Sequence, residues 1–339
     1  MIDPEIKIKL SYISGLETVV VDELQKNDFQ IINRNEDSML IEFKSDLFEQ
    51  VKKLRSVSKA FLVLQDGLYN PSYVAKHKSI LNSLIDVVIK NDTFKTFKIN
   101  CAGAGSEEVR SIARYVEDTY KISESDEADL KIHIVKIGNL WEIGVQITPR
   151  PLSVRDYKVS NMSGAMDPTI AYAVNHFANL GSAKSYLNIF SGSSTLLIEA
   201  AQCYENLERL VGFDNDKKHL SLSIQNIKKA GLIKRIEIKE ADIVDNPDFG
   251  KFDVVVSDLP FGMSISKGED LEGLYKYFIE YSERVLNPKG KLVVYTSEHE
   301  LLEQILSSSN FKISRSLEIK IITNVNSYLR PKIFVCELS

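Results

Sequence analysis

Cysteine, metal-ligand spacing and long apolar runs are all scarce in this chain of 339 residues. Its three cysteines, Cys101, Cys203 and Cys336, are far apart and odd in number, which argues against a disulfide framework and a cysteine-based zinc site. The five histidines show no ligand spacing either, so we expect no metal. No apolar run approaches the ~20 residues that span a bilayer, and the segment from Met1 to Lys7 does not resemble a signal peptide. The sequence therefore predicts a cytoplasmic protein that does not enter a membrane.

The chain also lacks an excess of basic charge. Its net charge of −5 argues against nucleic-acid binding through the global field. A local basic surplus occurs between Phe311 and Lys332, where five basic residues stand against Glu318 alone. Any RNA contact must come from such patches, and the alternative for each patch is a solvated basic face.

Residues 1–149 contain two small α+β patterns. In residues 1–66 the expected elements are a strand at 6–10, a helix at 16–24, a strand at 38–43, a helix at 47–54 capped by Asp46, and an apolar segment at 60–65. In residues 67–149 they are a helix at 71–88, a strand at 93–100, a helix at 106–120 that starts at Ser106, and strands at 129–135 and 141–147 joined by a turn at Gly138-Asn139. The first pattern is typical of a ferredoxin-like domain. Thr148-Pro-Arg-Pro151 then interrupts the chain and indicates a domain boundary.

Residues 150–339 show strands that alternate with helices. Asp167 and Pro168 supply an N-cap and a first-turn proline for a helix over 169–180. Strands are expected at 185–190, 210–214, 236–242, 252–258 and 291–296. This alternation predicts an α/β fold with a doubly wound parallel sheet.

Polar residues follow four consecutive predicted strands. The first is followed by Asn188-Ile-Phe-Ser-Gly-Ser-Ser-Thr195, whose small residues and following helix suit a closely bound ligand. Asp214 is placed to hold ribose hydroxyls, Asp242 to accept from an adenine amine, and Asp258 ends the fourth strand. Neither a phosphate loop nor a Gly-x-Gly-x-x-Gly fingerprint occurs, which weighs against nucleoside triphosphates and nicotinamide cofactors. A sulfonium cofactor with a ribose, an adenine and no phosphates, S-adenosylmethionine, fits this pattern.

The most informative segment is Val254-Val-Val-Ser-Asp-Leu-Pro-Phe-Gly262. A buried strand ends at Asp258, Pro260 removes a backbone donor, and Gly262 frees the chain to turn. A carboxylate and free carbonyls can accept from an amine, and the Phe261 ring can stack on a base. The segment also resembles the Asp/Asn-Pro-Pro-aromatic segments of amino-group methyltransferases, and this resemblance favours methylation of a planar amine. The alternative is an ordinary strand exit, in which Asp258 caps a turn and Phe261 fills the core.

These segments resemble one family of RNA-modifying enzymes. Leu16-Glu17 and Asp22-Glu23-Leu24 resemble its ferredoxin-like module, and residues 70–148 resemble its THUMP module. The catalytic-domain likeness rests on Arg155-Asp-Tyr157-Lys158, Asp167-Pro-Thr-Ile-Ala171, residues 191–200, Asp214, Asn226 with Ala230-Gly231, Asp242, and above all Asp258-Leu-Pro-Phe-Gly262. Over nearly its whole length, the chain is similar to the THUMP-domain guanosine-N2 RNA methyltransferases, particularly the subgroup that modifies the tRNA acceptor stem.

The resemblance implies a domain plan, a cofactor, a partner and a set of site residues. The domains are a ferredoxin-like domain at 1–66, THUMP at 67–149 and a Rossmann-like methyltransferase domain at 150–339. The cofactor is S-adenosylmethionine, and the partner is tRNA, bound by a monomer. The implied catalytic residues are Asp258, Pro260 and Phe261. The implied cofactor-binding residues are Asn188, Phe190, Ser191, Gly192, Ser193, Thr195, Asp214, Asn215, Ala241, Asp242 and Asp258, and the implied RNA contacts are Lys95, Lys98, Arg110, Arg114, Arg155 and Arg330.

Two positions depart from the family pattern. Asn188 stands where the family usually has Asp, so the hydrogen bonding is kept but the charge facing the cofactor's ammonium group is lost. Ser194 stands where the family usually has a second Gly, which adds a side chain at a close backbone approach. Two alternatives therefore stay open beside tRNA methylation. They are an amino methyltransferase acting on rRNA or DNA, and a non-catalytic RNA-binding homologue.

Overall fold

The computed structural model describes residues 6–44, 47–66, 74–101, 106–138, 140–160, 164–261, 270–324 and 327–338. Contacts within the chain separate two compact units. Unit 1 comprises Met1–Tyr12 and Val20–Ser153, and unit 2 comprises Ile13–Val19 and Val154–Ser339. The further division of residues 1–149 at residue 66 stays a prediction.

Unit 1 is built on one sheet of eight strands, in the order β2-β3-β1-β4-β8-β7-β5-β6. The pairing of β4 with β8 joins the strands of the two predicted N-terminal modules into this single sheet. Most neighbours are antiparallel, but β5 runs parallel to both β6 and β7. The strands are β1 (Lys7–Ser11), β2 (Ile31–Arg34), β3 (Ser38–Glu42), β4 (Lys59–Asp66), β5 (Thr96–Cys101), β6 (Ser123–Glu124), β7 (Leu130–Ile137) and β8 (Leu140–Gln146).

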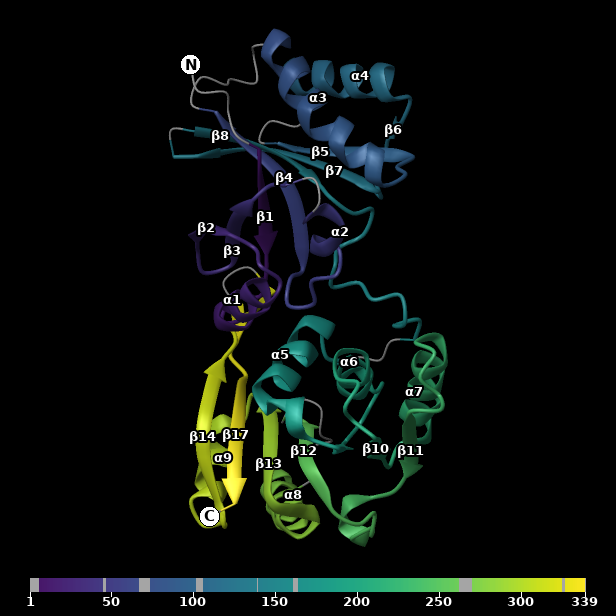
Figure 1. Ribbon diagram of the computed structural model, residues 1–339, viewed down its shortest axis with the longest axis vertical. Coiled ribbons are helices and arrows are strands. Elements are labelled where there is room, and N and C mark those ends of the chain that lie inside the picture. Colours follow the sequence, from purple (N-terminus) through teal and green to yellow (C-terminus); the bar gives the residue numbers. More distant parts are fainter. Residues whose placement is uncertain are drawn as a thin grey trace. The chain divides into compact units, whose positions relative to one another are not determined.

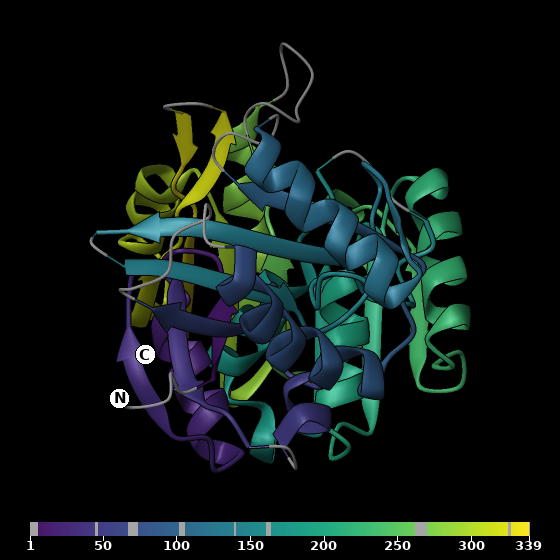
Figure 2. The same ribbon diagram turned by 90° about the horizontal axis from the view of Figure 1, so that it is seen from above.

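The helices of unit 1 are amphipathic, as their apolar spacing predicts. They are α1 (Glu17–Lys26, within this unit from Val20 onward), α2 (Phe48–Val51), α3 (Val74–Asn91) and α4 (Glu107–Tyr120). In α4 the apolar residues at i, i+3, i+4 and i+7 are buried, and the Ser106 side chain caps the helix by accepting from the Val109 N–H. Figures 1 and 2 show α3 and α4 lying side by side on the sheet. The α2 helix is shorter than predicted, and its expected cap, Asp46, lies outside the described residues.

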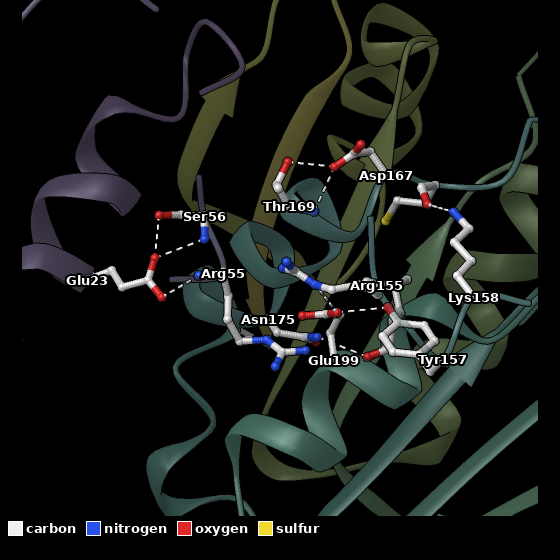
Figure 3. Close-up of polar contacts among 12 residues, drawn as sticks. Glu23, Arg55, Ser56, Arg155, Tyr157, Lys158, Asp167, Thr169, Asn175 and Glu199 are labelled. Carbon is white, nitrogen blue, oxygen red and sulfur yellow. Dashed lines mark hydrogen bonds and ion pairs between the residues drawn. The ribbon is translucent and has the colours of Figure 1, made fainter. Parts of the chain in front are cut away.

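A buried carboxylate fixes α1 to a loop of the same unit. Glu23 accepts from the backbone N–H groups of Arg55 at 2.8 Å and Ser56 at 2.9 Å, and also from the Ser56 hydroxyl (Figure 3). A buried charge is tolerated where several donors satisfy it. Glu23 therefore satisfies two backbone N–H groups of this loop and ties α1 to it.

Unit 2 contains a seven-stranded sheet in the order β11-β10-β9-β12-β13-β17-β14. The first five strands are mutually parallel, and β17 pairs antiparallel with both β13 and β14. The strands are β9 (Ser185–Ile189), β10 (Arg209–Asp214), β11 (Ile236–Glu240), β12 (Phe252–Asp258), β13 (Leu286–Thr296), β14 (Phe311–Glu318) and β17 (Lys332–Leu338). A separate antiparallel pair consists of β15 (Ile321–Asn324) and β16 (Ser327–Leu329).

Helices cover both faces of this sheet (Figure 1). On one face, Tyr186 of β9 donates a 2.8 Å hydrogen bond to Asn175 of α5, and Gly212 of β10 approaches Leu197 of α6. On the other face, apolar residues of the strands pack in one core with Phe278 of α8 and Leu302 of α9. The helices are α5 (Pro168–Ala178), α6 (Thr195–Cys203), α7 (Lys217–Lys229), α8 (Leu271–Val285) and α9 (His299–Leu306), with short 3-10 turns η2 (Leu180–Ser182) and η3 (Ile243–Asp245).

The predicted α/β, Rossmann-like fold of this part is confirmed. Asp167 caps α5 by accepting from the Thr169 N–H, with Pro168 in the first turn, and the five predicted strands are the five parallel ones. The sequence pattern did not predict β14 and β17. Most of β14 is exposed, so it lacks the apolar run that marked the central strands.

Candidate active site

A pocket of about 1050 Å³ lies at the carboxyl ends of the parallel strands of unit 2. Open α/β sheets bind their ligands at this edge. Twelve of the thirteen predicted catalytic and cofactor-binding residues line the pocket, namely Asn188, Phe190, Ser191, Gly192, Ser193, Thr195, Asp214, Asn215, Asp242, Asp258, Pro260 and Phe261. Ala241 is not among the lining residues, but its N–H donates to the Asp214 carbonyl at 3.1 Å and so joins two strand ends.

Two unsatisfied polar atoms mark the end of β9. Asn188 is buried, and its amide nitrogen donates to the carbonyls of Ile189 at 3.2 Å and Val256 at 3.1 Å. Its oxygen Oδ1 is buried without a hydrogen-bond partner among the described residues, and so is the Ser191 hydroxyl. Buried polar atoms are nearly always paired, so an acceptor and a hydroxyl on a pocket wall indicate a polar ligand.

The loop after β9 holds an unusual backbone conformation. Phe190, Gly192 and Ser194 have φ values of 57°, 50° and 62°, all in the left-handed region. Ser194, where glycine was expected, is fully buried, and its hydroxyl contacts that of Ser223 on α7 at 2.5 Å. It does not line the pocket. The added Ser194 side chain thus forms a hydrogen bond with α7 and does not occupy the pocket.

Hydrogen bonds from neighbouring residues orient the Asp214 carboxylate at the end of β10. Oδ2 accepts from the Gly192 N–H at 2.9 Å, and Oδ1 accepts from the Asp216 N–H at 3.0 Å and lies 3.2 Å from His219 Nδ1. A carboxylate has about four acceptor positions, so one remains on Oδ2. These bonds tie the β9 loop to β10 and hold the carboxylate at the pocket.

The end of β11 is tied to that of β10 in the same way. Asn215 donates from its side-chain amide to Asp242 Oδ2 at 2.8 Å. The other oxygen, Asp242 Oδ1, accepts from the Val244 N–H at 3.1 Å and caps the η3 turn. Asp242 therefore keeps acceptor capacity on Oδ2 while its position is fixed from two sides.

Asp258 ends β12 and stands on the pocket wall without a hydrogen-bond donor among the described residues. Burial raises the pKa of its carboxyl to about 8. The Pro260 carbonyl accepts from the Tyr275 hydroxyl at 3.1 Å, and the Phe261 ring lies 5.9 Å from that of Tyr295, at 52°. The expected turning residue, Gly262, lies outside the described part of the chain.

Sequence reasoning missed one wall of the pocket. Gly273, Leu274 and Tyr277 of α8 line it together with the N-cap Asp270, at i, i+3, i+4 and i+7 spacing from Asp270. This periodicity was visible, but periodicity alone does not say what a helix face meets. His219, Gly164, Ala165, Met166 and Val244 also line the pocket without a prior prediction.

The residues predicted to contact RNA fall into two groups. In unit 1, Lys95 and Arg110 are exposed, Lys98 is 3.0 Å from Asp126, and Arg114 is paired with Glu107. In unit 2, Arg330 lies 2.8 Å from Glu318, and Arg155 is largely buried. All six roles stay predictions.

Arg155 belongs to an internal cluster (Figure 3). Its Nε lies 3.1 Å from Oε1 of Glu199, which is fully buried on α6, and the Tyr157 hydroxyl donates to the same oxygen at 2.8 Å. A buried carboxylate requires such donors. The guanidinium of Arg155 is therefore engaged inside unit 2.

The described residues contain neither a membrane-spanning helix nor a cluster of metal ligands. No described helix has the length and apolar content needed to cross a bilayer. Across the same residues, no three histidine, cysteine or acidic side chains gather closely enough to hold a metal ion.

The pocket-forming half of the chain matches a known protein family. The family model described as "RMKL-like, methyltransferase domain" matches residues 155–325. This is half of the chain, and it includes the pocket-lining residues from Gly164 to Tyr277.

The chain is also similar to curated proteins over part of its length. The chain is 27% identical over 221 residues to the U6 snRNA (guanine-N(2))-methyltransferase THUMPD2 of Bos taurus, covering 62% of this chain and 42% of that protein. It is 30% identical over 165 residues to the tRNA (guanine(6)-N2)-methyltransferase of Thermus thermophilus, covering 48% and 49%. The chain thus spans about half the length of these relatives.

The fold is shared over the whole length of one solved structure. TrmN from Thermus thermophilus superposes with a TM-score of 0.77 at 20% identity, covering 99% of this chain and all of that one. Unit 2 has the α/β layers, the parallel strands and the pocket at their carboxyl ends that the sequence predicts. On the match over half of its length, this chain belongs to the RMKL-like methyltransferase domain family.

Proposed function

We propose that this protein transfers a methyl group from S-adenosylmethionine to the 2-amino group of a guanosine in tRNA. The observation that carries the proposal is the exit of β12, where Asp258 and Pro260 line the same pocket as Asn188 and Asp214. An exocyclic amine has two N–H donors, and the Asp258 carboxyl and the Pro260 carbonyl would accept from them. The proposed monomer would act in the cytoplasm, as its composition suggests.

The pocket residues fit S-adenosylmethionine. The unpartnered Asn188 Oδ1 would accept from its ammonium group, and the unpartnered Ser191 hydroxyl would bond its polar tail. Asp214 would accept from the ribose hydroxyls, and Asp242 would accept from the adenine amine. When bound, the cofactor supplies an electrophilic methyl group on a positively charged sulfur.

Asp258 would also act as the proton acceptor in the reaction. When the C–N bond forms and the C–S bond breaks, the amine nitrogen becomes positive and must lose one proton. Because burial raises the pKa of Asp258 to about 8, its ionised form is a stronger base than an ordinary aspartate. Asp258 would therefore orient the amine first and accept its proton afterwards.

Phe261 and unit 1 would supply substrate binding. The partly exposed Phe261 ring would stack on the guanine, a contact worth ~1–3 kcal/mol in related complexes. A paired guanine cannot reach the pocket inside a duplex, so base flipping is required, at a cost of a few kcal/mol. We propose that unit 1, as a ferredoxin-like and THUMP module, offsets this cost by binding RNA elsewhere, with the acceptor stem as the target.

Competing substrates provide the test. Equal concentrations of tRNA, U6 snRNA and an rRNA fragment would be incubated separately with the protein and methyl-labelled cofactor. The proposal predicts label in tRNA at a rate well above the other two. The relative named for U6 snRNA makes that RNA the second candidate. Preferential labelling of U6 snRNA or rRNA would reject tRNA as the substrate, and no detectable cofactor binding would favour the non-catalytic alternative.

A further inference from the structure

The backbone that leaves β12 has unusual hydrogen bonding. The Leu259 N–H donates to the Tyr295 carbonyl at 3.0 Å, which extends the pairing of β12 with β13 by one residue. Pro260 has no N–H, so the ladder stops there. Among the described residues, the Pro260 peptide is held by one hydrogen bond, from the Tyr275 hydroxyl to its carbonyl at 3.1 Å.

The Tyr275 hydroxyl is itself held by a second residue. Tyr275 is fully buried on α8, and its Oη lies 2.7 Å from Thr296 Oγ1 at the end of β13. Thr296 Oγ1 also accepts from the Glu298 N–H at 3.0 Å. The Pro260 oxygen can only accept, so the Tyr275 hydrogen must point to it, and Thr296 must donate to Tyr275. The donors therefore form a chain in one direction, from Glu298 through Thr296 and Tyr275 to Pro260.

We propose that this chain, the hydroxyl relay of Tyr275 and Thr296, fixes the Pro260 peptide and so positions the pocket-lining residues Asp258 and Phe261 on either side of it for the substrate. The inference rests on the proposed function, which gives these two residues their roles. Tyr275 occupies one of the two lone pairs of the Pro260 carbonyl oxygen. Burial raises the pKa of the Tyr275 phenol well above its ordinary value, so the hydroxyl keeps its proton over the working pH range. The exit of β12 is thus in place before substrate arrives.

The same helix offers a matched control. Tyr281, also buried on α8, donates from its hydroxyl to the carbonyl of Pro247 at 2.9 Å. Pro247 does not line the pocket. Tyr275→Phe and Tyr281→Phe therefore remove the same kind of bond from the same helix, one at the proposed site and one away from it.

The first test compares turnover. Tyr275→Phe should lower kcat on the methylated RNA about tenfold while the Kd for S-adenosylmethionine changes less than about twofold. Tyr281→Phe should lower the free energy of unfolding to a similar extent but keep kcat within about twofold of wild type. Thr296→Val should act like Tyr275→Phe, Thr296→Ser should retain most of kcat, and the double variant Tyr275→Phe/Thr296→Val should lose little more than either single one. Equal kcat for the two tyrosine variants would overturn the relay.

The second test does not depend on activity. In a protein with 4-fluorophenylalanine at position 261, the fluorine resonance senses the nearby Tyr295 ring. Tyr275→Phe should shift or broaden this resonance, whereas Tyr281→Phe should not. An unchanged resonance in Tyr275→Phe would reject the relay even if the enzyme methylates tRNA. Conversely, a shifted resonance in a protein that methylates no RNA would reject the proposed function and leave the positioning of this segment supported.

Discussion

Replacing Asp258 with asparagine should remove most of the methyl transfer without unfolding the protein. The substitution keeps the shape of the side chain but turns one acceptor oxygen into an N–H donor that faces the substrate amine. A hydrogen bond to a charged group contributes about 1.5–3 kcal/mol, and the proton acceptor is lost as well. We therefore expect single-turnover methylation to fall about a hundredfold or more, which corresponds to about 2.7 kcal/mol of transition-state stabilisation.

The pH dependence provides a sharper test of the same residue. With the pKa of Asp258 raised to about 8 by burial, only about one tenth of the carboxyl is ionised one pH unit lower. The wild-type kcat/KM should therefore rise with pH up to about 8 and then level off, and Asp258→Asn should lack this rise. Since ionisation of a group with a raised folded-state pKa opposes folding, the variant should be at least as stable as wild type above pH 8. Near-normal turnover with an unaltered pH profile in Asp258→Asn would refute this role.

Four other variants, one of them a double substitution, test the remaining parts of the account. Asp214→Ala should weaken S-adenosylmethionine binding by about 1.5–3 kcal/mol in calorimetry, and unchanged affinity would mean that the ribose site is misplaced. Asn188→Asp should tighten the same binding if a charge facing the ammonium matters; equal or weaker binding would defeat that argument. Arg110→Glu with Arg114→Glu should weaken tRNA binding about tenfold in filter assays, unless unit 1 has no part in RNA binding. In unit 1, burial disfavours the charge of Glu142, but hydrogen bonds from a histidine, a lysine and a glutamine together lower its pKa to about 2. Glu142→Gln should therefore cost up to about 3 kcal/mol of unfolding free energy above pH 5, a loss that shrinks as pH falls toward 2; a pH-independent loss in denaturant titrations would contradict it.

Those pocket residues could be predicted whose positions follow from the sequence of a single strand or helix end. Val254 to Val256 form a β-branched run that ends at Asp258, and a buried parallel strand places its last residue at the ligand-binding edge. The N-caps Ser106 and Asp167 were equally local, because a cap side chain bonds a backbone group within the next few residues. Such features need no knowledge of distant contacts.

The rest depends on contacts between distant segments. The Tyr275 hydroxyl meets Pro260 and Thr296 only after three elements have packed, and no spacing in the sequence signals that meeting. The raised pKa of Asp258 likewise follows from burial in the folded protein. The ion pair of Arg155 with Glu199 on α6 also forms only in the folded protein, while its role as an RNA contact stays a prediction. Charge alone does not distinguish an internal ion pair from a surface one.

Mass spectrometry of nucleosides tests the central claim most directly. Unmodified tRNA would be incubated with the protein and S-adenosylmethionine carrying a deuterated methyl group, digested to nucleosides, and compared with a parallel reaction of Asp258→Asn. The account predicts deuterated N2-methylguanosine from the wild-type reaction and at most about one hundredth as much from the variant at early times. Deuterated methyl on an adenine or cytosine instead, or no labelled nucleoside despite measurable cofactor binding, would contradict it.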